Sequence, residues 1–174
     1  MPLSETAQKN YTRMFGDFPP PLADSDPEFT RLFLDFALDE VPSQTKLDDR
    51  THFLTVLAAL MGCQGLDCFQ AMAPAALRSG LYPVELKELV YQGTAYLGLG
   101  RVLPFLKAVN EALTAAGVPL PLEEQGTTDP DSRLEAGNQA QVDIFGTHMR
   151  GFQNSGPQES RHINRWLAGN CFGD

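Results

Sequence analysis

Apolar residues recur at helical spacing along most of the chain, and no segment alternates apolar and polar residues as a strand does. One set of large apolar residues, spaced i, i+3, i+4 and i+7, shares a helix face: Phe29, Leu32, Phe33 and Phe36. Asp26 can cap this helix, and Pro27 suits its first position, where a missing N–H costs nothing. The pattern predicts an all-α protein.

Further helices follow from the same spacing. A helix over residues 48–62 should bury a second apolar set, Phe53, Val56, Leu57 and Leu60. The next is expected over residues 67–78, with Gly80 as a left-handed cap. Proline opens another helix over residues 83–97, and a helix over residues 101–116 comes before a stop at glycine. Together these segments predict a helical domain over residues 1–117.

Residues 118–131 are polar and contain prolines, which is typical of a linker. Beyond them, Ser132 can cap a helix that reaches about Arg150, and a last helix is expected over residues 157–171. The region 132–174 is therefore predicted to be a separate helical extension.

Two short stretches near the N-terminus resemble two stretches near the C-terminus. Tyr11–Gly16 is similar to Gln141–Gly146, and Phe29–Leu34 is similar to Ile163–Ala168, at offsets of 130 and 134 residues. The hypothesis is that the chain begins a second copy of its N-terminal pattern and stops before the core of that copy. An apolar stripe around Trp166 would then be buried against a neighbouring subunit or remain exposed.

Composition narrows the classes of function. The formal net charge is −9 over 174 residues, and an acidic surface argues against nucleic acid or an anionic membrane as a partner. No apolar run approaches the roughly 18 residues of a membrane span, and the N-terminus lacks a signal-peptide pattern. Three cysteines are too few for a disulfide framework, so a reduced, cytoplasmic protein is expected. Three scattered histidines predict no metal site.

The block from Leu47 to Leu113 resembles the carboxymuconolactone decarboxylase family, which includes the alkylhydroperoxidase D proteins. The resemblance rests on several local signatures: the aliphatic helix Leu54–Leu60, the element Ala75–Gly80, the pair in Glu85–Glu88, and Tyr96–Gly98 before a small-residue break. It implies an alkylhydroperoxidase D-like helical bundle that assembles as a trimer or hexamer. The C-terminal segment similarly resembles the start of the second domain in two-domain members.

The resemblance implies two possible chemistries. Decarboxylases of the family act on a carboxylated muconolactone without a metal or an organic cofactor. Hydroperoxidases use a C-x-x-C pair with a histidine and a glutamate. Here Met72 stands at the position of the family histidine, Cys68 at the second cysteine and Gly65 at the first. Cys63 is the nearest other thiol, and Asp49 is the nearest carboxylate to the place of the glutamate. Either chemistry therefore lacks its usual proton carrier.

The two cysteines allow two interpretations. Cys68 is expected in the first turn of a helix, where unpaired N–H groups and the helix dipole stabilise a thiolate. Cys63, just past the preceding helix, could then form a disulfide with it. Free cysteines also commonly serve as small apolar side chains, and both could simply pack beside the turn.

The other candidate residues are also ambiguous. Arg50 could hold a substrate carboxylate while His52 moves protons, but helix capping and a surface ion pair explain the same residues. Glu88 could act as a general acid beside Tyr96, although a solvated helix face is the simpler explanation.

Three functions follow as hypotheses. The first is a cofactor-independent decarboxylase acting on a small carboxylated lactone. The second is a thiol-dependent alkylhydroperoxidase that uses Cys63 and Cys68. The third is a non-catalytic oligomerising domain. The expected partners are a small-molecule substrate and further copies of the chain.

Overall fold

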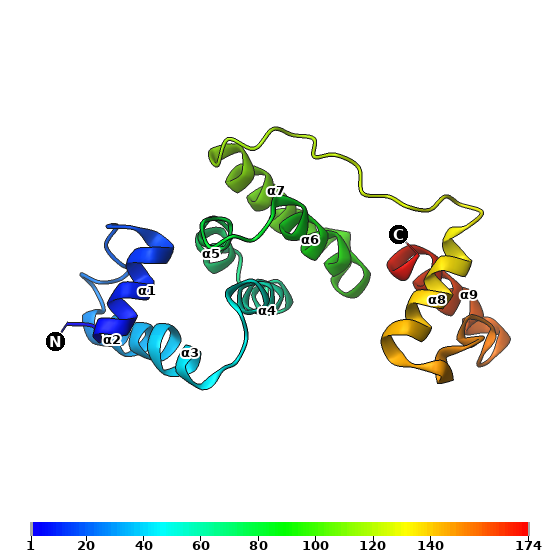
Figure 1. The fold of residues 1–174 in the computed structure, drawn as a ribbon, viewed down its shortest axis with the longest axis horizontal. Helices are drawn as coiled ribbons and strands as arrows, with labels where there is room; N and C mark the ends of the chain where they lie inside the picture. Colours follow the sequence, from blue (N-terminus) through cyan, green and yellow to red (C-terminus); the bar gives the residue numbers. More distant parts are fainter. Residues whose placement is uncertain (1, 174) are drawn as a thin grey trace. The chain divides into compact units, whose positions relative to one another are not determined.

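The structure is a computed structural model that describes residues 2–173. Helices make up all of its regular secondary structure, and no strand occurs among these residues, so the protein is all-α as the sequence predicts. The chain forms two compact units, drawn in Figure 1. The first comprises Met1–Gly93 and Leu97–Leu120, and the second comprises Thr94–Tyr96 and Pro121–Asp174.

The first unit begins with a helix that the sequence analysis did not identify, α1 (Glu5–Phe15). The hydroxyl of Ser4 caps it by accepting a hydrogen bond from the amide of Ala7 at 3.0 Å. Three residues at i, i+4 and i+7 are buried: Ala7, Tyr11 and Met14. This narrow apolar stripe lets α1 pack on both the following π-helix and α5.

The predicted helix at Pro27 is confirmed as α2 (Pro27–Asp35), which continues as the π-helix η1 (Phe36–Glu40) and the short α3 (Val41–Gln44). Its apolar face is not in the core. The four large side chains are each more than half exposed: Phe29 62%, Leu32 53%, Phe33 54% and Phe36 54%. The buried residues of this segment are instead Thr30 and Leu38.

The core of the first unit is built from α4 (Asp49–Gly62), α5 (Leu66–Arg78), α6 (Pro83–Leu97) and α7 (Leu99–Ala115). Helix α5 packs on both α4 and α7. Phe69 of α5 and Phe105 of α7 meet edge to face with ring centroids 5.1 Å apart. The largest fully buried side chains all come from these helices: Phe53, Phe69, Phe105, Leu57, Met61, Leu86, Leu113, Val90, Val102 and Val109.

The second unit contains α8 (Arg133–Phe145), three short 3₁₀ segments (Thr147–Met149, Phe152–Asn154 and Gln158–Ser160), α9 (Arg161–Leu167) and the π-helix η5 (Ala168–Phe172). The predicted end of α8 near Arg150 is wrong, because Gly146 adopts φ +108° and stops the helix. The predicted helix over 157–171 is divided into 3₁₀, α and π turns.

None of the helices in the described part of the chain combines the length and apolar character needed to cross a lipid bilayer.

Candidate functional site

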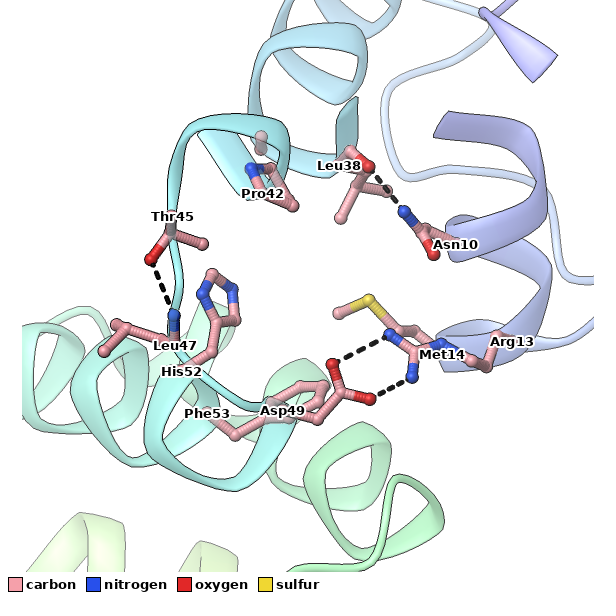
Figure 2. Close-up of a pocket in the computed structure, with 11 residues that line it drawn as sticks. Asn10, Arg13, Met14, Leu38, Pro42, Thr45, Leu47, Asp49, His52 and Phe53 are labelled. Atoms are coloured by element: carbon pink, nitrogen blue, oxygen red, sulfur yellow. Dashed lines mark hydrogen bonds and ion pairs between the residues drawn. The ribbon is translucent and has the colours of Figure 1, made fainter. Parts of the chain in front are cut away.

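A pocket of about 140 Å³ opens in the first unit between α1, the η1–α3 segment and the start of α4. Figure 2 shows its lining side chains around the opening. Apolar and polar side chains from these three segments line the pocket together: Asn10, Arg13, Met14, Ala37, Leu38, Pro42, Thr45, Leu47, Asp49, His52 and Phe53. In another protein, an engineered apolar cavity of about 150 Å³ binds benzene, so a volume of this size suits one small ring.

The start of α4 places two polar side chains at the pocket. The carboxylate of Asp48 caps the helix by accepting a hydrogen bond from the amide of Thr51 at 2.8 Å. Asp49 and His52 then follow at i and i+3, on one side of the first turn. Phe53, which is 2% exposed, anchors this turn in the core.

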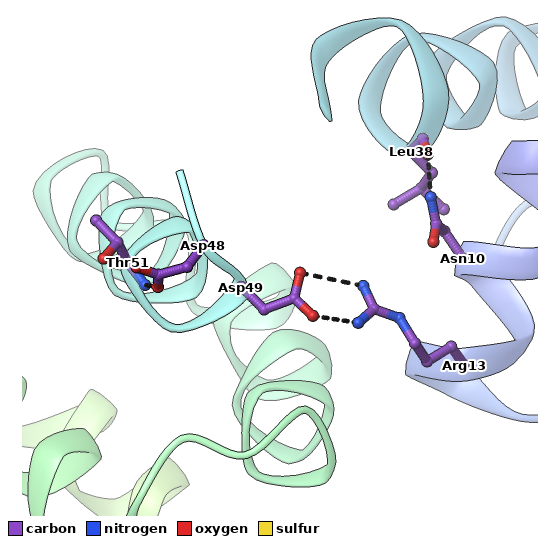
Figure 3. Close-up of polar contacts among 6 residues, drawn as sticks. All are labelled: Asn10, Arg13, Leu38, Asp48, Asp49 and Thr51. Atoms are coloured by element: carbon purple, nitrogen blue, oxygen red, sulfur yellow. Dashed lines mark hydrogen bonds and ion pairs between the residues drawn. The ribbon is translucent and has the colours of Figure 1, made fainter. Parts of the chain in front are cut away.

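Arg13 of α1 reaches across the pocket and forms a two-point ion pair with Asp49, drawn in Figure 3. The hydrogen bond from Arg13 holds the pKa of Asp49 below its usual value, and attraction to Arg13 and His52 acts in the same direction. Asp49 is therefore an anion at neutral pH. Asn10, on the same face of α1, donates to the carbonyl of Leu38 at 2.7 Å and ties α1 to η1.

The imidazole of His52 is half-buried and lines the pocket. Of the catalytic and substrate-binding residues proposed from the sequence, His52 lines this pocket, together with Asp49, the carboxylate nearest to the place of the family glutamate. Imidazole is the side chain that enzymes most often use to carry protons.

Arg50 and Glu88 lie elsewhere. Arg50 does not line the pocket and forms an ion pair with Glu85 of α6, which lowers the pKa of that carboxyl. The backbone amide of Tyr82 donates to Glu85 at 3.1 Å as well. Glu88 and Tyr96 are exposed on α6, and neither lines the pocket.

The cysteines lie at the joint between α4 and α5, as the sequence predicts. Cys68 is in the first turn of α5, and Cys63 caps the C-terminus of α4. Both are free thiols with exposed side chains, so neither contributes to the core. Met72, at the position of the family histidine, is half-buried on α5.

Sequence reasoning did not single out Arg13 or Asn10, because the helix that carries them was not identified. A signal was present: Ser4 precedes the stripe of Ala7, Tyr11 and Met14. The sequence does not show that α1 lies across α4, which brings Arg13 to Asp49. Among residues 2–173 no group of three or more His, Cys, Asp or Glu side chains could hold a metal ion.

Comparison with known protein families gives one match. The family model described as "Carboxymuconolactone decarboxylase family" matches residues 27–111, which run from α2 into α7. No curated protein and no solved structure matches the chain. The matched segment includes the pocket residues from Ala37 to Phe53, the cysteines Cys63 and Cys68, and the whole of α4, α5 and α6. On this match, the segment 27–111 belongs to the carboxymuconolactone decarboxylase family.

Proposed function

We propose that this protein is a decarboxylase that acts on a small carboxylated lactone in the pocket between α1 and α4, with His52 as the proton carrier. The observation that carries the proposal is the position of His52. Its imidazole opens on a ring-sized pocket beside the anionic Asp49 and opposite the buried side chains of Met14 and Leu38.

The reaction needs one proton and no electron donor. When the bond between the ring and its carboxylate breaks, CO₂ leaves and the electron pair stays on the lactone. That carbanion-like centre then takes one proton. A protonated His52, which lines the pocket, can donate it. A cofactor is not required by this balance.

The apolar wall has a second effect. A carboxylate loses part of its hydration beside Met14 and Leu38, whereas CO₂ carries no charge to be hydrated. Arg13 can hold the substrate at the pocket edge, since its guanidinium has five N–H donors and Asp49 engages two of its nitrogens. This role replaces the one expected for Arg50, which is paired with Glu85.

The test measures turnover of carboxylated five-membered lactones, monitored as CO₂ release, in the wild type and in His52→Gln. Glutamine preserves polarity and approximate size but carries no proton, so kcat should fall by about 10²–10⁴-fold with little change in binding measured by calorimetry. Arg50→Gln serves as the matched control at the same helix start and should retain turnover. A wild-type rate in His52→Gln would refute the assignment.

Exposed thiols favour a second candidate, a thiol-dependent hydroperoxidase. In that reaction the Cys68 thiolate attacks the terminal oxygen of the hydroperoxide and the O–O bond breaks. Cys68 becomes a sulfenic acid, and the departing alkoxide takes a proton from water to leave as the alcohol. Cys63 then condenses with it to form a disulfide and water, and an external dithiol reduces the disulfide. The exposure of both side chains and the helix N-terminus at Cys68 support this sequence.

Brief peroxide exposure followed by peptide mass mapping separates the two candidates. Rapid formation of a Cys63–Cys68 disulfide that is lost in Cys68→Ser and unchanged in His52→Gln would favour the peroxidase. Turnover that depends on His52 and is indifferent to Cys68→Ser would favour the decarboxylase. A protein inert in both assays would fit the third hypothesis, a non-catalytic oligomerising domain.

A further inference from the structure

The two units contain the same succession of structural features. In the first, α1 ends at Gly16, which has φ +72° and donates its amide hydrogen to the carbonyl of Thr12 at 2.8 Å. In the second, α8 ends at Gly146, which has φ +108° and donates to the carbonyl of Val142 at 2.8 Å. In each unit the next α-helix runs directly into a π-helix that packs on the first helix.

The repetition is therefore present in the structure as well as in the amino-acid sequence. π-Helices account for well under 1% of residues in soluble proteins, so their recurrence at the same place is a strong sign of a common pattern. The buried Tyr11 of α1 corresponds to the buried Gln141 of α8, with 5% and 3% exposure. Residues 133–173, named here the second hairpin, therefore repeat the first hairpin formed by α1, α2 and η1.

The first hairpin is seated on α4 and α5. Met14 is 4% exposed, and its carbonyl accepts a hydrogen bond from Nε of Arg78 on α5 at 3.0 Å. The preceding residue, Arg13, pairs with Asp49 on α4. A buried apolar knob next to an ion pair thus fixes this hairpin on a helix pair of the core.

The second hairpin has a corresponding face, in which an acidic residue stands where the first hairpin has a basic one. Ile144 stands at the position of Met14 and is 64% exposed. Asp143 stands at the position of Arg13 and is also exposed. Phe145, which follows them, is 51% exposed, and its ring centroid lies 5.8 Å from that of Phe172. The face is apolar at its centre and acidic beside it.

We propose that the second hairpin docks, through Ile144 and Asp143, on an α4–α5-type helix pair of another polypeptide that carries a basic side chain where this chain has Asp49. In this chain the α4–α5 pair is already occupied by the first hairpin. The core of another copy of this chain is disfavoured, because its Asp49 would face Asp143. Such a like-charge contact discriminates between partners that share one fold.

The binding test uses full-length variants of this chain as surrogate partners. Met14→Asp places a charge in the apolar seat of the first hairpin and frees the α4–α5 surface. The bait M14D/D49R then presents a basic surface, and the bait M14D presents an acidic one. Each is immobilised, and binding of the wild-type chain, I144D and D143R is measured by surface plasmon resonance.

The expected pattern is reciprocal. The wild-type chain should bind M14D/D49R at least about tenfold more tightly than M14D, and D143R should reverse that preference. I144D should weaken binding to both baits. Equal binding of all three chains to the two baits, or no binding to baits that circular dichroism shows to be helical, would overturn the proposal.

If the charge at residue 14 unfolds the baits, M14A and M14A/D49R replace them, because alanine loosens the seat without burying a charge. Hydrogen exchange of residues 140–146 provides a second measurement in the same mixtures. Protection of that segment by M14A/D49R, and its loss in D143R, is expected. Exchange that neither bait alters would contradict docking through this face.

Discussion

Gly137 of α8 is the point of closest approach in the second unit, and replacing it by alanine tests how that unit is held together. A Cβ at Gly137 would lie 1.7 Å from the carbonyl oxygen of Ala168 and 2.5 Å from its carbon. Ordinary contact begins near 3.4 Å, so the η5 backbone would have to retreat by about 1.7 Å. Both obstacles are backbone atoms, which cannot rotate aside as a side chain can.

Two effects oppose each other in Gly137→Ala. Alanine gains about 1 kcal/mol of helix propensity over glycine. Overpacking costs about 1–3 kcal/mol, and here more, because α8 and η5 would separate along their whole contact. We therefore expect the free energy of unfolding of the second unit to fall by about 2 kcal/mol or more. Urea unfolding measures it, with fluorescence of Trp166 as the reporter, since this is the one tryptophan in the sequence and lies in α9.

The matched control is Gly100→Ala in the first turn of α7, where a Cβ would meet no atom within 4 Å. That change should be neutral or stabilising by up to about 1 kcal/mol. If Gly137→Ala leaves the Trp166 transition within about 0.5 kcal/mol of the wild type, then the close approach does not hold the unit together and the argument fails.

Other consequences are simpler to test. The hydrogen bond from Arg13 lowers the pKa of Asp49, so this pair should stabilise the fold above the carboxyl's unfolded pKa of about 3.9 and stop doing so as the pH falls through the lower folded pKa. Because both side chains are about half exposed, their coupling in an R13A/D49A double-mutant cycle should be about 0.2–1 kcal/mol at pH 7, and a value unchanged at pH 2 would refute it. Asn110→Ala removes the acceptor of the buried Lys87 ammonium and should cost about 1–3 kcal/mol in thermal unfolding. Ser4→Ala should cost about 1 kcal/mol, seen as faster amide exchange at the start of α1.

The core helices could be predicted from the sequence because their apolar stripes are wide and their ends carry clear signals. Phe53 and Leu57 are buried as expected on α4, and Gly80 adopts the left-handed φ of +98° expected of a cap. The burial of α2 could not be judged in this way. Periodicity places Phe29 and Phe33 on one face, but whether another element covers that face depends on tertiary packing.

The pocket was less predictable than the fold for a related reason. His52 and Asp49 are near neighbours in sequence, so helical spacing alone places them on one side of α4. Arg13 lies 36 residues before Asp49, and its position depends on how α1 packs. Arg50 shows the converse: its charge and place at a helix start suggested substrate binding, but Glu85 of α6 compensates that charge.

The hairpin and the pocket depend on each other. Asn10, Arg13 and Met14 of the first hairpin supply one side of the pocket, whereas Asp49, His52 and Phe53 of the core supply the other. The pocket is therefore complete only while a hairpin occupies the α4–α5 surface. It follows that the occupying hairpin also supplies one of the charges at the pocket edge. A core that received the second hairpin would face Asp143 and Ile144 in place of an arginine and a methionine. Because the proposed partner core carries a basic side chain where this chain has Asp49, its pocket would keep an ion pair at the edge with the two charges exchanged, the anion on the hairpin and the cation on the core.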